Sequence, residues 1–191
     1  MVVYCTTYVL NSPGLTTPIM ACFAVGTIAV LPFVKKIDLR FGRKKAMMIG
    51  AGLVALSKII FIPFSTFVPV AMFHTFILGI SVPINIVMFS MTRSEVSDII
   101  GHEQNRRIDG MISNLQGLIN KCGASLTIFF IGMTLEATGF NSTLPEQPTT
   151  VNFMIISLLG WISLIVAAFF VWSASRVTIE KEYANLLALK Q

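Results

Sequence analysis

The residue with the clearest chemical potential is a lysine inside an apolar stretch. Lys121 lies within residues 111–135, and a Lys at the centre of a membrane helix costs about 3 kcal/mol of insertion free energy. At 3.6 residues per turn it belongs to a broad polar arc, which is expected to face a bundle interior or a water-filled cavity. Two interpretations follow: a substrate or ion site, or a structural Lys paired with a carboxylate on another helix. The arc consists of two adjacent stripes: Asn114, Gly117, Lys121 and Ser125, then Ser113, Gln116, Asn120 and Thr127.

Two other titratable residues lie close to the expected ends of apolar stretches. Lys58 is predicted to extend its ammonium toward the lipid headgroups while its stem stays in hydrocarbon. His74 is interpreted as an interfacial histidine and not as a proton relay, because the sequence positions no partner for it.

The densest mixed-charge segment lies between residues 93 and 109. Its ion pairs are predicted to close the cytoplasmic mouth of a transporter, and a merely solvated loop is the alternative. The residues of this expected gate are Glu95, Asp98, Arg106 and Arg107.

The sequence gives little support for catalysis. Glu95 and Asp98 would share one turn of a helix without a surrounding cleft, which disfavours a paired-carboxylate hydrolase. His102 and Glu103 are adjacent and would point apart on a helix, which disfavours a metal site. We therefore expect neither an enzyme nor a bound metal.

The composition of the chain indicates what kind of structural element carries these residues. The 191 residues are 54% apolar, and there are no charges in residues 59–92 or 147–175. Spanning the hydrocarbon of a bilayer takes roughly 20 apolar residues in a helix. The sequence therefore predicts an all-α, polytopic transmembrane bundle in contact with lipid, and its net charge of +5 is attributed to membrane-flanking loops and not to nucleic-acid binding.

Breaks and charges divide the chain into spans. The expected bundle covers residues 1–175, followed by a cytoplasmic tail over 176–191. Pro63 and Pro69 supply a break in the long uncharged run, because each proline removes a backbone donor. The expected spans are 15–34, 46–64, 68–90, 111–135 and 151–172, after a partial span over 1–10.

The basic residues predict the orientation. Six lie in residues 35–45, three in 91–109 and three after Trp172, whereas the alternate connections hold none. Lys and Arg concentrate in cytoplasmic loops of membrane proteins. Both loops and the C-terminus are therefore expected in the cytoplasm, with the chain spanning the cell membrane several times.

Several short motifs are similar to those of a known carrier family. Glu95-Val-Ser-Asp98, Arg107-Ile-Asp-Gly110 and Asn120-Lys-Cys-Gly-Ala-Ser125 resemble the second half of the glycoside–pentoside–hexuronide:cation symporters, melibiose permease-like members of the major facilitator superfamily. A basic loop also looks like the superfamily's loop between its eighth and ninth helices. The loop residues concerned are Asp38, Gly42, Arg43 and Lys44.

The resemblance implies roles for individual residues. Lys121 matches the family's eleventh-helix Lys, implicated in sugar binding and cation coupling, and Gln116 matches a polar residue near the sugar. Gly117 stands where some members carry a hydroxyl, and Ile86 where an aromatic platform holds the sugar. The expected substrate-binding set is Lys121, Gln116, Gly117, Asn120, Asn114 and Ile86.

The resemblance also implies what the chain is and does. It corresponds to the C-terminal six-helix half of a sugar:cation symporter, expected to be a fragment and inactive without the N-terminal half. The partners implied are a sugar or glycoside and a coupling Na+ or H+, whose ligands would lie in the missing half, with no other cofactor. A non-transporting membrane scaffold or assembly subunit, or half of another major facilitator exporter, stays open as an alternative.

Overall fold

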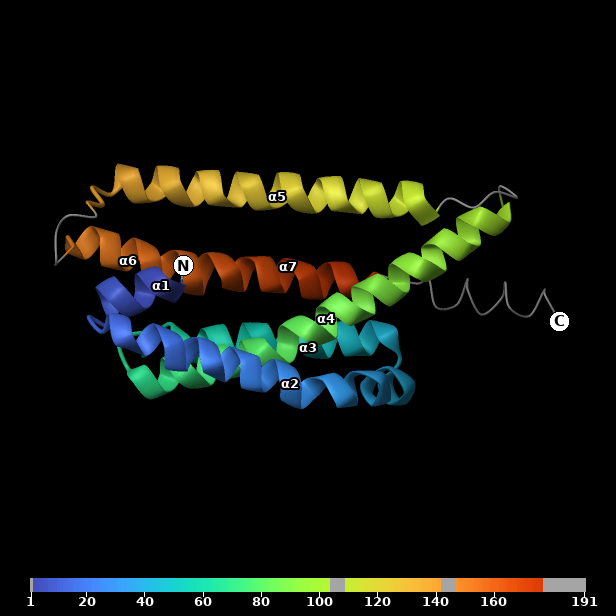
Figure 1. Ribbon diagram of the computed structural model, residues 1–191, viewed down its shortest axis with the longest axis horizontal. Helices are drawn as coiled ribbons and strands as arrows, with labels where there is room; N and C mark the ends of the chain where they lie inside the picture. The colour runs from blue at the N-terminus through green and yellow to red at the C-terminus, as the bar shows by residue number, and fades with distance from the viewer. Residues whose placement is uncertain (1, 104–108, 142–146, 177–191) are drawn as a thin grey trace.

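The computed structural model describes residues 2–103, 109–141 and 147–176. These residues form helices and short connections, without any strand among them (Figure 1). The all-α helix bundle expected from the sequence is confirmed. In chain order the elements are α1 (Val2–Tyr4), π-helical η1 (Cys5–Val9), 3-10 helical η2 (Pro13–Leu15), α2 (Thr16–Phe41), α3 (Arg43–Phe61), α4 (Val68–Glu103), α5 (Asp109–Ala137), α6 (Thr149–Ser157), π-helical η3 (Leu158–Ile162) and α7 (Ser163–Ser175).

Four helical stretches are long and apolar enough to cross a membrane: Pro13–Phe41, Val68–His102, Asp109–Ala137 and Thr149–Ser175. The remaining long helix, α3, has 19 residues and carries three basic residues in its first turn and a fourth at Lys58. The turn between α3 and α4 occupies the predicted proline break. The count of five full spans stays a prediction, since it depends on α3.

The end of α4 differs from the expectation of a loop over residues 91–109. The helix continues without interruption to Glu103, about three and a half turns past the expected end of the span. Glu and Arg favour helix, and the buried side chains of Thr92 and Ser97 keep this extension packed. A charged segment therefore extends an apolar span as one helix.

Two glycines bring α2 and α4 into close contact. A Cβ atom built at Gly79 would lie 2.2 Å from the carbonyl oxygen of Phe23, and one built at Gly26 would lie 2.5 Å from that of Phe76. Thr27 Oγ1 also donates a hydrogen bond of 3.2 Å to the Gly79 carbonyl. Membrane helices pack closely through such small residues, because lipid provides no hydrophobic force between helices.

Replacing Gly79 by Val is expected to destabilise the bundle by about 1–3 kcal/mol, because α4 must move away from α2 to make room. Thermal unfolding of the detergent-solubilised protein, followed by size-exclusion chromatography, measures this effect. Gly52→Ala is the matched control, since a Cβ at Gly52 meets nothing within 4 Å. Equal unfolding temperatures for Gly79→Val and Gly52→Ala would contradict the close contact.

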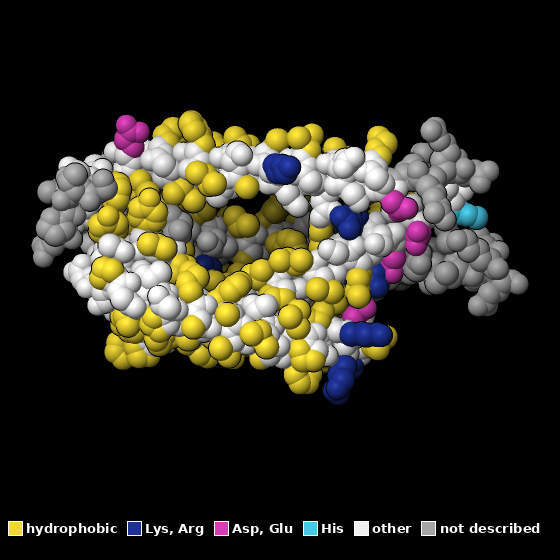
Figure 2. Space-filling model, viewed as in Figure 1, with side chains coloured by type: hydrophobic (Ala, Val, Ile, Leu, Met, Phe, Trp, Pro, Cys, Tyr) yellow, Lys and Arg dark blue, Asp and Glu magenta, His cyan; other side chains and the backbone are white. Residues whose placement is uncertain are grey.

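The packed core consists of two clusters near opposite ends of the bundle. One contains Phe61, Ala71 and Val151, and the other contains Met47, Ile84 and Ala174. Between them lies a cavity of about 660 Å³, lined by residues of α3, α4, α5, η3 and α7. Figure 2 shows the hollow between α5 and the helices below it.

The helix α5 is the least covered of the long helices. Only 6% of its most apolar stretch is buried, against 39% for α4. It runs beside α6 and α7 along one side of the bundle (Figure 1). Large apolar side chains on several faces of α5 are exposed, among them Leu118, Ile128 and Phe129.

The connections expected in the cytoplasm lie together. The turn between α2 and α3, the end of α4, the start of α5 and the end of α7 all lie at one end of the bundle (Figure 1). Most of the charged side chains visible in Figure 2 gather at this end. This arrangement agrees with the predicted topology, in which alternate connections share one side.

Reporter fusions are expected to assign that end to the cytoplasm. Fusions after Lys44 and Asp109 should report a cytoplasmic location, and fusions at Ser65 and Pro145 an external one, because Lys and Arg are retained in the cytoplasm. Paired alkaline phosphatase and green fluorescent protein fusions make the measurement. A cytoplasmic signal at Pro145 would contradict the helix count.

Candidate functional site

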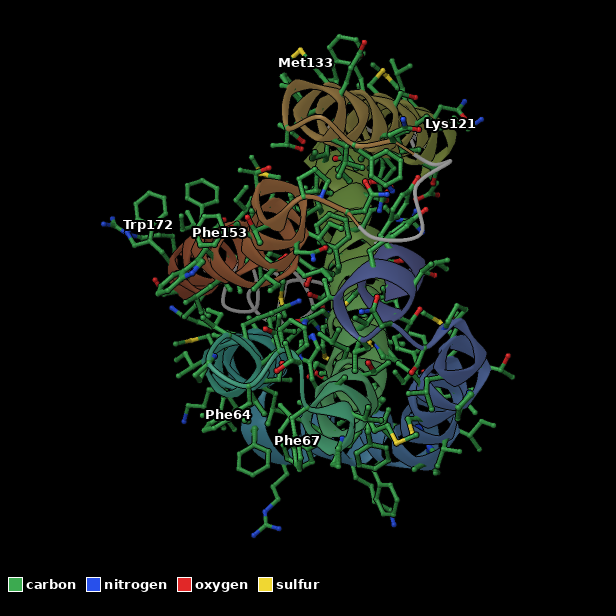
Figure 3. All side chains as sticks on the ribbon, turned by 90° about the vertical axis from the view of Figure 1, so that its left-hand side faces the viewer. Phe64, Phe67, Lys121, Met133, Phe153 and Trp172 are labelled. Atoms are coloured by element: carbon green, nitrogen blue, oxygen red, sulfur yellow. The ribbon has the colours of Figure 1, made fainter. Side chains whose placement is uncertain are left out.

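Lys121 projects from an exposed face of α5. Figure 3 shows its side chain on the side of α5 that points away from α6 and α7. Asn114, which belongs to the same polar stripe as Lys121, is exposed as well. No carboxylate among residues 2–103, 109–141 and 147–176 forms an ion pair with Lys121. A structural pair with a carboxylate is therefore not formed within the described part of the chain.

The neighbouring stripe of α5 faces inward. Gln116 Oε1 accepts a hydrogen bond of 2.8 Å from Arg93 Nη1 of α4. Gln116, Asn120 and Arg93 line a cavity of about 420 Å³ that α3 and α7 complete. Asn120 is nevertheless exposed, because the cavity is open. One stripe of the predicted polar arc thus borders an internal cavity, while the stripe of Lys121 does not.

The structure separates the predicted substrate-binding set into two groups. Gln116 and Asn120 border the 420 Å³ cavity. Ile86 of α4 is 60% exposed, and Gly117 is half-buried. Arg93 joins the first group although its sequence position gave no binding role; its place directly after an apolar run is the signal that could have revealed it.

The sequence-based interpretations of Lys58 and His74 are wrong. Lys58 is only 4% exposed and His74 only 5%, so both side chains are enclosed by protein and neither extends from the surface of the bundle. Lys58 Nζ lies 3.3 Å from His74 Nε2 and donates a hydrogen bond of 2.6 Å to the carbonyl of Leu159. The reason lies in the helix rotation: α3 turns Lys58 toward α4 and the last span, where protein partners replace water.

The basic loop forms an ion-pair network with α4. Gly42, at φ 77°, makes the sharp turn between α2 and α3, and its N–H donates to the Asp38 carbonyl at 2.8 Å. Arg43 then contacts Asp38, with Nε 3.6 Å from Oδ1, and pairs through Nη1 with Glu95 Oε1. Lys44, the next residue of the predicted basic loop, is half-buried.

Electrostatics keeps Arg43 charged within this network. Partial burial alone would lower the pKa of the guanidinium. The hydrogen bond and charge of Glu95, together with the charge of Asp38, outweigh this and raise the pKa above its ordinary value. The network therefore links the ends of α2, α3 and α4 by a permanent positive charge.

The predicted cytoplasmic gate is only partly described. Its Glu95 pairs with Arg43 of the basic loop, and Asp98 is exposed. Ser97 Oγ donates a hydrogen bond to Asp109 Oδ1, which joins the end of α4 to the start of α5. Arg106 and Arg107 lie outside the described residues, so their pairing stays a prediction.

The chemistry available at these sites is binding chemistry. Among the residues that the structure describes, no group of three or more His, Cys, Asp or Glu could hold a metal ion. The cavities instead present amide, guanidinium and ammonium groups on mostly apolar walls. Such walls with a few polar groups are typical of small-molecule sites between helices.

Comparison with known proteins places the chain among transporters. A family model described as MFS/sugar transport protein matches residues 1–180. An uncharacterized 29.9 kDa protein from Pseudescherichia vulneris is 26% identical over 176 residues, which are 88% of this chain and 64% of that protein. A glucuronide carrier protein homolog from Escherichia coli strain K12 is 28% identical over 133 residues, which are 66% of this chain and 29% of that protein.

The chain thus spans less than two thirds of the length of these curated relatives. No solved structure matches it significantly. The family model covers nearly all of the sequence, including every span and every candidate site residue. This chain belongs to the MFS/sugar transport protein family.

Proposed function

We propose that this chain forms the C-terminal half of a secondary transporter that moves a sugar or glycoside together with Na+ or H+. Membership in the sugar transport family supports the substrate class. The glucuronide carrier homolog supports a glycoside as cargo. In such carriers two helix bundles rock around a site near the midplane of the bilayer, and the missing N-terminal half would complete that site and supply the cation ligands.

The observation that carries this proposal is the exposure of Lys121. A lysine in the middle of a membrane span is costly and is normally turned toward a protein interior or a water-filled cavity. Here it lies on the least buried long helix, on the side away from α6 and α7 (Figure 3). A second helix bundle packed against this side would line, with Lys121, a polar cavity.

The ion pairs at the charged end fit the same mechanism. In alternating access, one end of the carrier is closed while the other is open, and contacts between helices must hold each of these arrangements. The Asp38–Arg43–Glu95 network joins three helix ends, and the Arg93–Gln116 hydrogen bond joins α4 to the cavity side of α5. Movement of α4 would therefore change both the ion pairs of the gate and the hydrogen bond that borders the cavity.

The test is complementation between separately expressed halves. This chain alone is expected to give no accumulation of a labelled glucuronide or other glycoside, because one wall of the proposed cavity is absent. Co-expression with the six-helix N-terminal half of a related carrier should restore uptake driven by an imposed Na+ or H+ gradient. Uptake into membrane vesicles measures both results.

Two results would contradict the proposal. Strong cation-driven uptake by the 191 residues alone would mean that copies of the chain rebuild the site by themselves. Absence of uptake with a half that assembles stably with this chain would favour a scaffold role. Co-purification of the two halves establishes assembly independently of transport.

A further inference from the structure

The most unusual polar group in the interior is the ammonium of Lys58. Its Nζ lies 3.3 Å from His74 Nε2 and 2.6 Å from the carbonyl oxygen of Leu159. The His74 ring stacks on Phe61 with centroids 4.6 Å apart, which constrains the plane of the imidazole. Three helical segments, α3, α4 and η3, therefore meet at one buried pair of titratable side chains.

The surroundings of this pair provide no compensating negative charge. The residues of η3 and α7 include no titratable side chain, and α5 contributes only Thr127 and Ile131 to the adjoining cavity wall. Another titratable side chain close to the pair is that of Cys5, in η1. No Asp or Glu of the described ranges forms an ion pair with Lys58.

The hydrogen bond limits how many protons the pair can hold. A contact between two nitrogen atoms needs one donor and one acceptor. A doubly protonated pair would offer only donors and would place two positive charges 3.3 Å apart. While the contact exists, the pair is therefore either neutral or carries a single added proton.

Two cavities border the pair. Lys58 lines the cavity of about 660 Å³ between the core clusters, which is large enough to contain many water molecules. His74 lines a separate cavity of about 30 Å³ together with Cys5, Thr6 and Thr75, which has room for roughly two waters. The Nζ–Nε2 contact joins the walls of these two spaces.

We propose that Lys58 and His74 form a buried proton-binding site. A proton from the 660 Å³ cavity adds to the lone pair of the Lys58 amine and gives an ammonium. The ammonium then donates one hydrogen bond to the Leu159 carbonyl and one to the lone pair of His74 Nε2. Release returns the proton to the cavity and restores the neutral amine, and no other covalent bond changes.

The position of the site gives the bound proton a structural effect. A charged donor makes a stronger hydrogen bond than a neutral one, so protonation tightens the bond from α3 to Leu159. Leu159 belongs to the π-helical segment η3, and such segments are frequent at functional sites. In a carrier, which is the function proposed above, this gives the C-terminal half a proton site of its own beside the cation ligands expected in the N-terminal half, and the last span is the element that responds to the proton.

The pair can be tested directly by NMR, without transport. The sequence contains two histidines, His74 and His102, so the ¹⁵N spectrum of histidine-labelled protein in lipid nanodiscs has two imidazoles to follow. In Lys58→Met the titration midpoint of His74 should change by about one pH unit or more. An identical His74 titration in wild type and Lys58→Met would overturn the proposal.

Transport by the assembled carrier tests the role of the site. Lys58→Arg keeps a cation and its hydrogen bonds, but a guanidinium does not release its proton. It is expected to remove most of the pH dependence of glycoside uptake between about pH 5.5 and 8, and His74→Gln should do the same. His102→Gln is the control that should keep the wild-type profile.

The outcomes separate this inference from the proposed function. Uptake with an unchanged pH profile in Lys58→Arg would overturn the proton site and leave the transport function standing. Uptake that depends on Na+ alone, with a flat pH profile in wild type, would do the same. If the wild-type assembly transports nothing, the proposed function fails, and the NMR titration still decides whether the pair binds a proton.

Discussion

Replacing Lys121 by Ala is expected to abolish active accumulation in a carrier that contains this chain. Lys121 is a charge in the middle of the α5 span, exposed on the side away from α6 and α7. Its retention costs about 3 kcal/mol of insertion free energy, which the proposed substrate or ion contact would explain. Lys121→Arg should rescue poorly, because a planar guanidinium does not replace a compact ammonium. Vesicle uptake under an imposed cation gradient gives the measurement.

The control variant is Lys45→Ala, which removes an exposed lysine at the start of α3. It is expected to keep at least half of the wild-type uptake, since exposed basic residues contribute little individually. Immunoblots must accompany both variants, because removal of Lys121 should ease insertion of its helix. A well-expressed Lys121→Ala carrier with unchanged uptake and cation dependence would contradict a role in binding.

Reversing the charge of Arg43 is expected to have the second largest effect. Arg43→Glu would place three carboxylates, those of residues 38, 43 and 95, around the turn between α2 and α3. The lost pairing and new repulsion should lower stability by about 1–3 kcal/mol and remove most transport. The same loss is expected for Glu95→Arg. Thermal unfolding in detergent and vesicle uptake measure the two effects.

The double variant makes this prediction specific. Combining Arg43→Glu with Glu95→Arg restores one opposite-charge pair, and it should recover a large part of the lost stability, because residues in direct contact are energetically coupled. Arg40→Glu, at an exposed position on the same turn, is the control and should change stability by less than about 0.5 kcal/mol. Additive losses in the double variant would show that Arg43 and Glu95 do not act as a pair.

The revised position of Lys58 changes one expectation drawn from the sequence. A lysine near the end of a span usually extends to the interface, so a substitution there would be harmless. Buried at 4% exposure and bonded to Leu159, Lys58 instead joins helices that are distant in the sequence. Linear position along a span does not reveal this, because it carries no information on the rotation of the helix about its axis.

By itself, the sequence determined the class of protein and its family. Uncharged runs and the placement of 14 basic residues predict membrane helices, since a helix of roughly 20 apolar residues spans the hydrocarbon of a bilayer and satisfies its backbone groups internally. The motifs around Lys121 pointed to sugar transporters, which the family match confirms. These features depend on composition and local spacing, and both can be read along one chain.

Only the tertiary structure decided which polar groups meet. The contact of Arg43 with Glu95 joins residues separated by all of α3 and most of α4. Lys58 and Leu159 are 101 positions apart, and Arg93 reaches Gln116 between neighbouring helices. The inward stripe of α5 and the outward stripe of Lys121 look equivalent in the sequence, because both share the same period. Helix packing distinguishes them, since it fixes the rotation of each helix and thereby selects the side chains that face a partner.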